Sequence, residues 1–169
     1  MGKFFIFDFD DTLTGFSVYN TWLYRTGWTF PPPLGGLFKG AEEVLDRIKG
    51  DRIPLHMLTI NIVLNDDMKW KKLNRLDITR WFDERNVHMV RRKTPEVFAR
   101  ICRGRDLSRC YMVGNSYAND IKPSLEAGIK AIYIPRPHVK RLYDPFLPDH
   151  ERLIRLGRIS DILKIYDDL

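Results

Sequence analysis

Near the start of the sequence stands Phe4-Phe5-Ile6-Phe7-Asp8-Phe9-Asp10-Asp11-Thr12-Leu13, in which an apolar run leads directly into a cluster of acids. A short apolar run that is bounded by turn-forming residues predicts a buried strand. Side chains two positions apart in a strand point the same way, so Asp8 and Asp10 are expected to lie close together. Two like charges at that separation are unfavourable unless a cation or a shared proton compensates them. The stretch therefore indicates a functional site rather than a solvated turn.

Similar apolar runs recur along the chain and alternate with helical patterns. The predicted strands are Phe4–Phe9, Ile53–Leu58, Val87–Val90, Tyr111–Val113 and Ala131–Ile134. The predicted helices are Ala41–Lys49, Asp66–Leu76, Pro95–Cys102 and Tyr117–Ala127. This alternation predicts an α/β fold, with a mainly parallel five-stranded sheet covered by helices on both faces. In such a fold ligands bind beyond the carboxyl ends of the strands, which is where the acids after the first strand lie.

The composition limits the class of protein. A chain of 169 residues with 44% hydrophobic content fits one domain over residues 1–169. Its apolar runs are too short to span a bilayer, so we expect no membrane partner. Cys102 and Cys110 lack the spacing of a metal or redox motif, and we expect reduced thiols in a cytoplasmic protein. The histidines show no zinc-ligand spacing, and His56 is interpreted as a core residue. The net charge of +6 would allow a nucleic-acid partner, but the basic residues are scattered, so solubility is the better explanation of the charge.

Polar residues of distinct kinds follow the later predicted strands. Thr59 comes directly after the second, Lys93 precedes the helix that begins at Pro95, and Gly114-Asn115-Ser116 follows the fourth, with Asp120 farther on. Each has a structural explanation when taken alone, such as a helix cap, a turn or a solvated charge. Because all of them are expected at one edge of the sheet, together they favour catalysis.

These four motifs, in this order over residues 4 to 134, resemble those of the haloacid dehalogenase (HAD) superfamily. The resemblance implies a three-layer α/β/α Rossmann-like fold and a magnesium-dependent phosphatase that works through an aspartyl-phosphate. Dehalogenases of the family lack an acid at the position of Asp10, so its presence disfavours dehalogenation. Asn115 stands where the family usually has Asp, and an amide oxygen brings no charge, so weaker magnesium binding is expected. The alternative is a non-catalytic HAD-fold phosphate-binding or interaction module, which the departure at Asn115 leaves open.

The resemblance also implies a role for each candidate residue. Asp8 would be the nucleophile, Asp10 the general acid and base, and Lys93 the group that neutralises the phosphate and Asp8. Phosphate oxygens would be bound by Thr59, Lys93 and backbone N–H groups near Phe9 and Ile60. The Mg²⁺ ligands would be Asp8, the backbone carbonyl of Asp10, Asn115 and Asp120.

The family's cap domain has little room in this sequence. Only Gly15–Lys39 is inserted at the first cap position, and its aromatic, proline-rich composition predicts a structured loop with one short helix. The stretch from Thr59 to Lys93 is filled by a helix and a strand of the core itself. The site is therefore expected to be open. An open site implies a phosphorylated macromolecule as substrate for a monomer, or a small phosphate ester for a homo-oligomer in which a second subunit covers the site.

Overall fold

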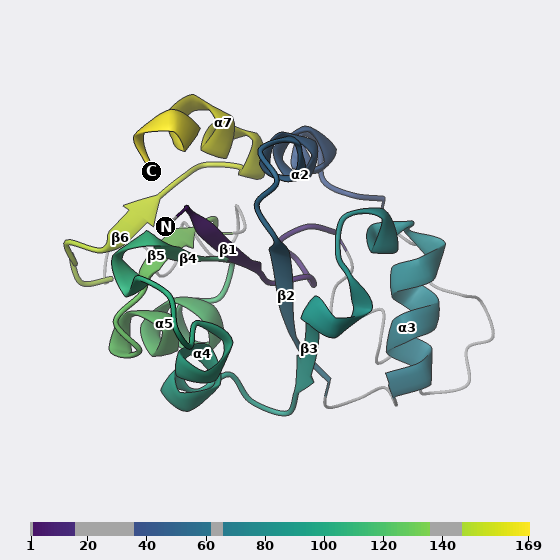
Figure 1. The fold of residues 1–169 in the computed structure, drawn as a ribbon, viewed down its shortest axis with the longest axis horizontal. Helices are drawn as coiled ribbons and strands as arrows, with labels where there is room; N and C mark the ends of the chain where they lie inside the picture. The colour runs from purple at the N-terminus through teal and green to yellow at the C-terminus, as the bar shows by residue number, and fades with distance from the viewer. Residues whose placement is uncertain (1, 16–35, 62–65, 136–146) are drawn as a thin grey trace.

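The computed structural model describes residues 2–15, 36–61, 66–135 and 147–169. Six strands form one sheet in the order β3-β2-β1-β4-β5-β6, and every neighbouring pair is parallel (Figure 1). The strands are β1 (Phe4–Phe7), β2 (Leu55–Ile60), β3 (Val87–Val90), β4 (Cys110–Gly114), β5 (Lys130–Tyr133) and β6 (Leu153–Arg155). Since parallel strands present their carboxyl ends at the same edge, the ends of β1, β2 and β4 meet there.

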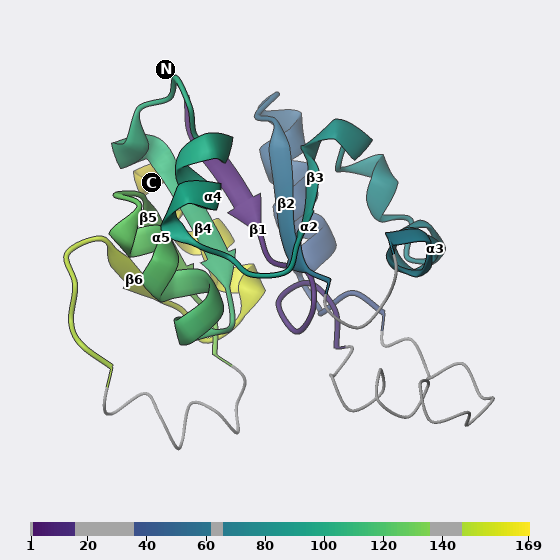
Figure 2. The ribbon, with the colours of Figure 1, turned by 90° about the horizontal axis from the view of Figure 1, so that it is seen from below.

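Helices cover both faces of this sheet. They are α2 (Ala41–Gly50), α3 (Asp66–Arg75), α4 (Pro95–Ile101), α5 (Lys122–Glu126) and α7 (Ile162–Ile165). Figures 1 and 2 show α2 and α7 on one face, α4 and α5 on the other, and α3 beside β2 and β3. The result is the three-layer α/β/α arrangement expected from the sequence.

The central strand β1 is buried on both faces. Phe5 and Phe7 pack into the same cluster as Val44 of α2. Phe4 and Ile6 point the other way and share a cluster with Phe98 of α4. Burial on both faces explains why β1 is a continuous apolar run and does not alternate with polar residues.

Two histidines pair across neighbouring strands β2 and β3. The Nδ1 atom of His56 lies 3.2 Å from the Nε2 atom of His88, and their rings are stacked. Burial, with the nearby charge of Arg105 and the other imidazole, lowers the pKa of His56 to about 4, and burial also lowers that of His88. The interpretation of His56 as a core residue did not include this pairing.

Several predicted boundaries were wrong. The sheet has six strands rather than five, because the three-residue edge strand β6 gave no signal in the sequence. Strand β2 extends to Ile60, so Thr59 lies inside the strand and not after it. The predicted helix Tyr117–Ala127 begins with a π-helical turn over Tyr117–Ile121 and becomes α-helical only in α5. Most of the Gly15–Lys39 prediction falls on residues 16–35, outside the described part of the chain.

No helix within the described ranges combines the length and the apolar content needed to cross a membrane. Cys102 and Cys110 are buried free thiols.

Candidate active site

The chain makes a tight loop directly after β1. The Asp8 amide still donates to the carbonyl of Val113 on β4, at 2.9 Å. Asp11 then takes a left-handed conformation with φ 68°, and the Leu13 amide donates back to the carbonyl of Phe9 at 3.1 Å. This reversal brings the Thr12 hydroxyl to Asp8, where it donates to Oδ2 at 2.8 Å. One carboxylate oxygen of Asp8 is therefore held by a neighbour from the same loop.

The other oxygen of Asp8 faces a buried lysine. Lys93 donates to Asp8 Oδ1 at 2.5 Å and to Asp120 Oδ1 at 2.6 Å. The exposed fractions of Asp8, Lys93 and Asp120 are 6%, 3% and 1%. Three charged groups are thus buried together where the chain leaves β1, β3 and β4.

Asp120 is fixed by the backbone around it. Its Oδ2 atom accepts from the Ser116 amide at 2.9 Å. A Cβ atom at Gly114 would lie only 2.5 Å from the Cβ of Asp120. The glycine at the end of β4 is therefore required by the close approach of the acid, and not by an unusual backbone conformation.

Burial and charge shift the pKa values of this cluster. Burial raises the pKa of Asp8 to about 6, and the charges of Asp120 and Asp10 act in the same direction while Lys93 opposes them. Burial alone would lower the pKa of Lys93, but Asp120 and Asp8 outweigh it and the pKa is raised. Lys93 is consequently charged at neutral pH, and Asp8 loses its proton less readily than an exposed aspartate.

A second lysine, which the sequence did not identify, contacts Asp10. Lys69 of α3 is 2% exposed, and its ammonium donates to Asp10 Oδ2. The same ammonium lies 5.4 Å from the centre of the Phe9 ring. In the sequence Lys69 is one of many scattered basic residues, and no pattern distinguishes it.

The hydroxyl of Thr59 is buried and has no hydrogen-bond partner among the described residues. An unpaired buried hydroxyl costs about 1–3 kcal/mol unless a ligand or water satisfies it. Thr59 is fully buried near the carboxyl end of β2, with Ile60 as the last residue of that strand. Phe9 lies in the loop after β1 with its ring in the core.

Solved structures of known proteins share this architecture. An uncharacterized protein from Listeria monocytogenes serotype 4b superposes with a TM-score of 0.76 and 22% identity, over 99% of both chains. The D,D-heptose 1.7-bisphosphate phosphatase from B. bronchiseptica, complexed with magnesium and phosphate, gives a TM-score of 0.75 and 16% identity over 99% of both chains. A haloacid dehalogenase-like hydrolase from Xanthomonas campestris gives 0.74 and 16%, over 99% of this chain and 95% of the other. The chain has the HAD-like fold.

This confirms the fold implied by the sequence motifs. Sequence comparison alone does not reach the same result, because no protein-family model and no curated protein matches the chain. At these identities the likeness concerns the HAD-like fold, and the chemistry has to be argued from the side chains.

The oxygen atoms expected to bind magnesium can be compared with the geometry. The Thr12 hydroxyl lies 2.8 Å from Asp8 Oδ2 and 3.3 Å from Asn115 Oδ1, so these two oxygens lie beside the same hydroxyl. Within the described ranges, no three His, Cys, Asp or Glu side chains form a group that could hold a metal ion. An amide and a backbone carbonyl are not among those residue types, however, and hard neutral oxygens are ligands that magnesium accepts. The donor set therefore fits Mg²⁺ in its chemistry.

Proposed function

We propose that this protein is a magnesium-dependent phosphatase that hydrolyses phosphate monoesters through an aspartyl-phosphate on Asp8. The observation that carries the proposal is the buried cluster of Asp8, Lys93 and Asp120 at the carboxyl edge of the sheet. Burying two carboxylates and an ammonium brings a desolvation cost that apolar residues would avoid. Perturbed, buried charges at a ligand-binding edge are typical of catalytic sites. The hydrolases and phosphatases among structures of the same fold support this reading.

The first half of the reaction would form the covalent intermediate. A carboxylate oxygen of Asp8 attacks phosphorus, and the bond between phosphorus and the ester oxygen breaks. Asp10, in its protonated form, gives its proton to the departing oxygen, so the leaving group departs as an alcohol. In the second half, Asp10 takes a proton from water while the water oxygen attacks phosphorus. The bond from phosphorus to Asp8 then breaks, which releases inorganic phosphate and restores Asp8.

The remaining side chains would stabilise charge and hold the reacting groups. Lys93 would neutralise phosphate oxygens, and the unpaired hydroxyl of Thr59 would donate to one of them, which their contact with Asp8 and lack of a partner respectively support. Thr12 orients Asp8, and Lys69 orients Asp10. Bound Mg²⁺ would add positive charge against the phosphate. Its ligands would be Asp8, Asn115, Asp120 and the backbone carbonyl of Asp10.

The decisive experiment is turnover of p-nitrophenyl phosphate by the purified protein, with magnesium and with EDTA. We expect phosphate release that requires magnesium and that disappears in Asp8→Asn. Asp149→Asn is the matched control, because it makes the same chemical change at a fully exposed acid. Turnover in Asp8→Asn above a tenth of the wild-type rate would exclude an aspartyl-phosphate at this position.

The alternative function is phosphate binding without turnover, and the neutral Asn115 in the metal-ligand set is the observation that favours it. Calorimetry with inorganic phosphate separates the two functions. A binding module would bind phosphate while releasing none from any ester.

A further inference from the structure

The net charge of the chain is concentrated in residues 91–109. This stretch holds seven of the 28 basic residues but two of the 22 acidic ones, so its net charge is +5. The other 150 residues carry +1 in total. Outside this stretch the basic residues are scattered among acids and solubility explains them, but solubility does not explain why nearly all the net charge lies in one segment.

The stretch 91–109 crosses the molecule from one edge of the sheet to the other. It begins after the carboxyl end of β3, includes α4 and ends at the amino end of β4. Because β3 and β4 run in the same direction in the sheet, the chain between them has to return from the carboxyl edge to the amino edge. Figure 2 shows this return along the face that α4 covers. The charges of the stretch therefore follow one side of the protein.

Five arginines of this stretch are exposed and have no acidic partner. Among the residues that the structure describes, no carboxylate forms an ion pair with any of them. Exposed arginines elsewhere do have such partners, since Arg85 pairs with Asp83 and Arg158 pairs with Asp161. We call the five residues the arginine surface, and they are Arg91, Arg92, Arg100, Arg103 and Arg105.

The two acids of the stretch are engaged in their own turns. Asp106 Oδ1 accepts from the amide of Ser108 at 3.0 Å and from its hydroxyl at 2.7 Å. A hydrogen bond with Thr94 lowers the pKa of Glu96 at the start of α4. Neither acid is paired with a member of the arginine surface, so its positive charge is not neutralised locally.

The arginine surface borders two half-buried histidines. The guanidinium carbon of Arg105 lies 3.8 Å from the centre of the Phe4 ring, and that centre lies 4.5 Å from the centre of the His56 ring. Burial, the other imidazole and the charge of Arg105 lower the pKa of His56. Burial and the charge of Arg100 lower the pKa of His88. The surroundings of β1, β2 and β3 on this face are therefore positive, and an anion would be favoured there.

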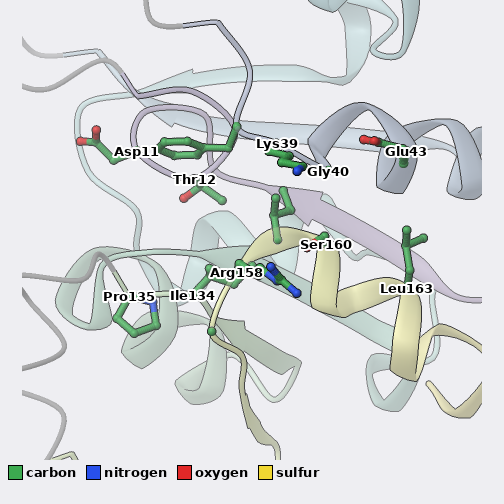
Figure 3. A pocket seen from close by; sticks show the side chains of 13 residues that line it. Asp11, Thr12, Lys39, Gly40, Glu43, Ile134, Pro135, Arg158, Ser160 and Leu163 are labelled. Atoms are coloured by element: carbon green, nitrogen blue, oxygen red, sulfur yellow. The ribbon is translucent and has the colours of Figure 1, made fainter.

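The cavity between the start of α2 and the turn before α7 does not share this imbalance. It has a volume of about 600 Å³, and Lys39 and Arg158 line it together with Asp11 and Glu43 (Figure 3). Two cations with two acids give no net preference for an anion. The unbalanced charge belongs to the arginine surface, on the opposite face of the sheet.

The composition of the arginine surface favours phosphate groups over an acidic protein. A guanidinium group can donate two parallel hydrogen bonds to one phosphate. Protein interfaces are centred on apolar and aromatic anchors, whereas Leu107 is the one exposed large hydrophobic residue within 91–109. A single strand of nucleic acid repeats its phosphates at short intervals, and it is flexible enough to follow arginines that lie on a loop, a helix and a turn.

We propose that the arginine surface binds single-stranded nucleic acid through its phosphate backbone. Arg91 and Arg92 directly precede Lys93, so the surface begins beside the buried cluster of the proposed active site. The proposal does not depend on the phosphatase function, because backbone binding requires no turnover.

The test compares two variants with the same net charge. Arg100→Gln/Arg103→Gln removes two members of the arginine surface, while Arg85→Gln/Arg158→Gln removes two exposed arginines that have acidic partners elsewhere. All four side chains are exposed, so both variants are expected to fold, and thermal melts check this. The probe is a fluorescein-labelled single strand of DNA of mixed sequence, without a terminal phosphate monoester. Its binding is measured by fluorescence anisotropy in EDTA at several sodium chloride concentrations.

We expect the wild type to bind the strand and to lose affinity as salt rises. Arg100→Gln/Arg103→Gln should raise Kd about tenfold at low salt, because two phosphate contacts are lost. The slope of log Kd against log salt concentration should also fall by about 1.4, since each contact with a single strand contributes about 0.7. Arg85→Gln/Arg158→Gln should leave Kd within about twofold of the wild type and the slope unchanged.

Three results would overturn the proposal. The first is no binding by the wild type at low salt. The second is an equal loss of affinity in the two variants, which would assign the attraction to net charge and not to a defined surface. The third is binding of labelled poly-aspartate as tightly as the DNA strand, with the same dependence on Arg100 and Arg103, which would assign the surface to an acidic protein. Because the DNA probe has no phosphate monoester, none of these results depends on whether the protein is a phosphatase.

Discussion

Replacing Asp8 by Asn should abolish turnover and at the same time stabilise the fold. The amide fits the observed contacts, because its oxygen can accept from Lys93 while its nitrogen donates to the Thr12 hydroxyl. Burial raises the pKa of Asp8 from the ordinary 3.8 to about 6. A pKa difference of about 2 between the folded and the unfolded state corresponds to about 3 kcal/mol. The ionised carboxylate therefore destabilises the folded protein by roughly this amount at pH 7.

The pH dependence follows from the proton count. Between pH 4 and pH 6 the folded state keeps a proton on Asp8 that the unfolded state has already released. The stability of the wild type consequently falls, through this group, as pH rises across that window, and the Asn variant lacks this loss. The advantage of Asp8→Asn should be near zero at pH 4 and about 3 kcal/mol at pH 7, which for a protein of this size is about 6–12 °C in Tm.

Urea denaturation of both proteins at pH 4, 5, 6 and 7 measures this difference, with EDTA present because a bound cation would favour the ionised carboxylate. The two proteins differ only at this residue, so the difference between them reports Asp8 together with its interactions with Lys93 and Asp120. An advantage that does not change with pH would show that burial of the Asp8 charge is not its cause. A variant less stable than the wild type at pH 7 would refute the reasoning altogether.

Three further predictions concern other residues of the site and the core. Lys69→Met should lower kcat about 10-fold or more, because the methionine removes the ammonium that holds Asp10. Lys69→Arg keeps the positive charge and should retain most of the wild-type kcat. Equal losses of kcat in the two variants, measured by steady-state kinetics, would contradict a charge-based role. Asn115→Asp should lower the magnesium concentration needed for half-maximal turnover, since it adds an anionic oxygen; a magnesium titration that shows no change would place Asn115 outside the metal's ligands. His56 and His88 have lowered pKa values, so their protonation favours the unfolded state. The stability that these two groups contribute should therefore be lost as pH falls from about 6.5 towards 4, opposite in sign to the contribution of Asp8. In His56→Phe this loss of stability between pH 7.5 and pH 5 should be smaller than in the wild type. Urea denaturation at the two pH values measures the loss, and an equal loss in both proteins would contradict the prediction.

The parts of the site that could be predicted are those that follow strands. An apolar run that ends in Asp8 fixes both a buried strand and the edge at which its acid lies. Lys93 and Asp120 could then be placed near Asp8, because parallel strands bring their carboxyl ends together. The structure does bring these three side chains into contact. Their catalytic roles stay predictions until turnover is measured.

The parts that could not be predicted depend on geometry that leaves no local pattern. Thr12 reaches Asp8 only because Asp11 takes a left-handed conformation, which few non-glycine residues adopt. Lys69 meets Asp10 across 59 positions of sequence, through the docking of α3 beside the sheet. The edge strand β6 is three residues long, which is too short for a period-two pattern to be recognised.

The contact between Gly114 and Asp120 has a consequence for how this site tolerates change. Any side chain at position 114 would push Asp120 away, and Lys93 would then lose one of its two carboxylate partners. A residue that carries no functional group can thus disable the site as thoroughly as the loss of a charged one. A mutational survey restricted to ionisable residues would miss it, and a designer who moves the catalytic residues onto another backbone has to carry this glycine along with them.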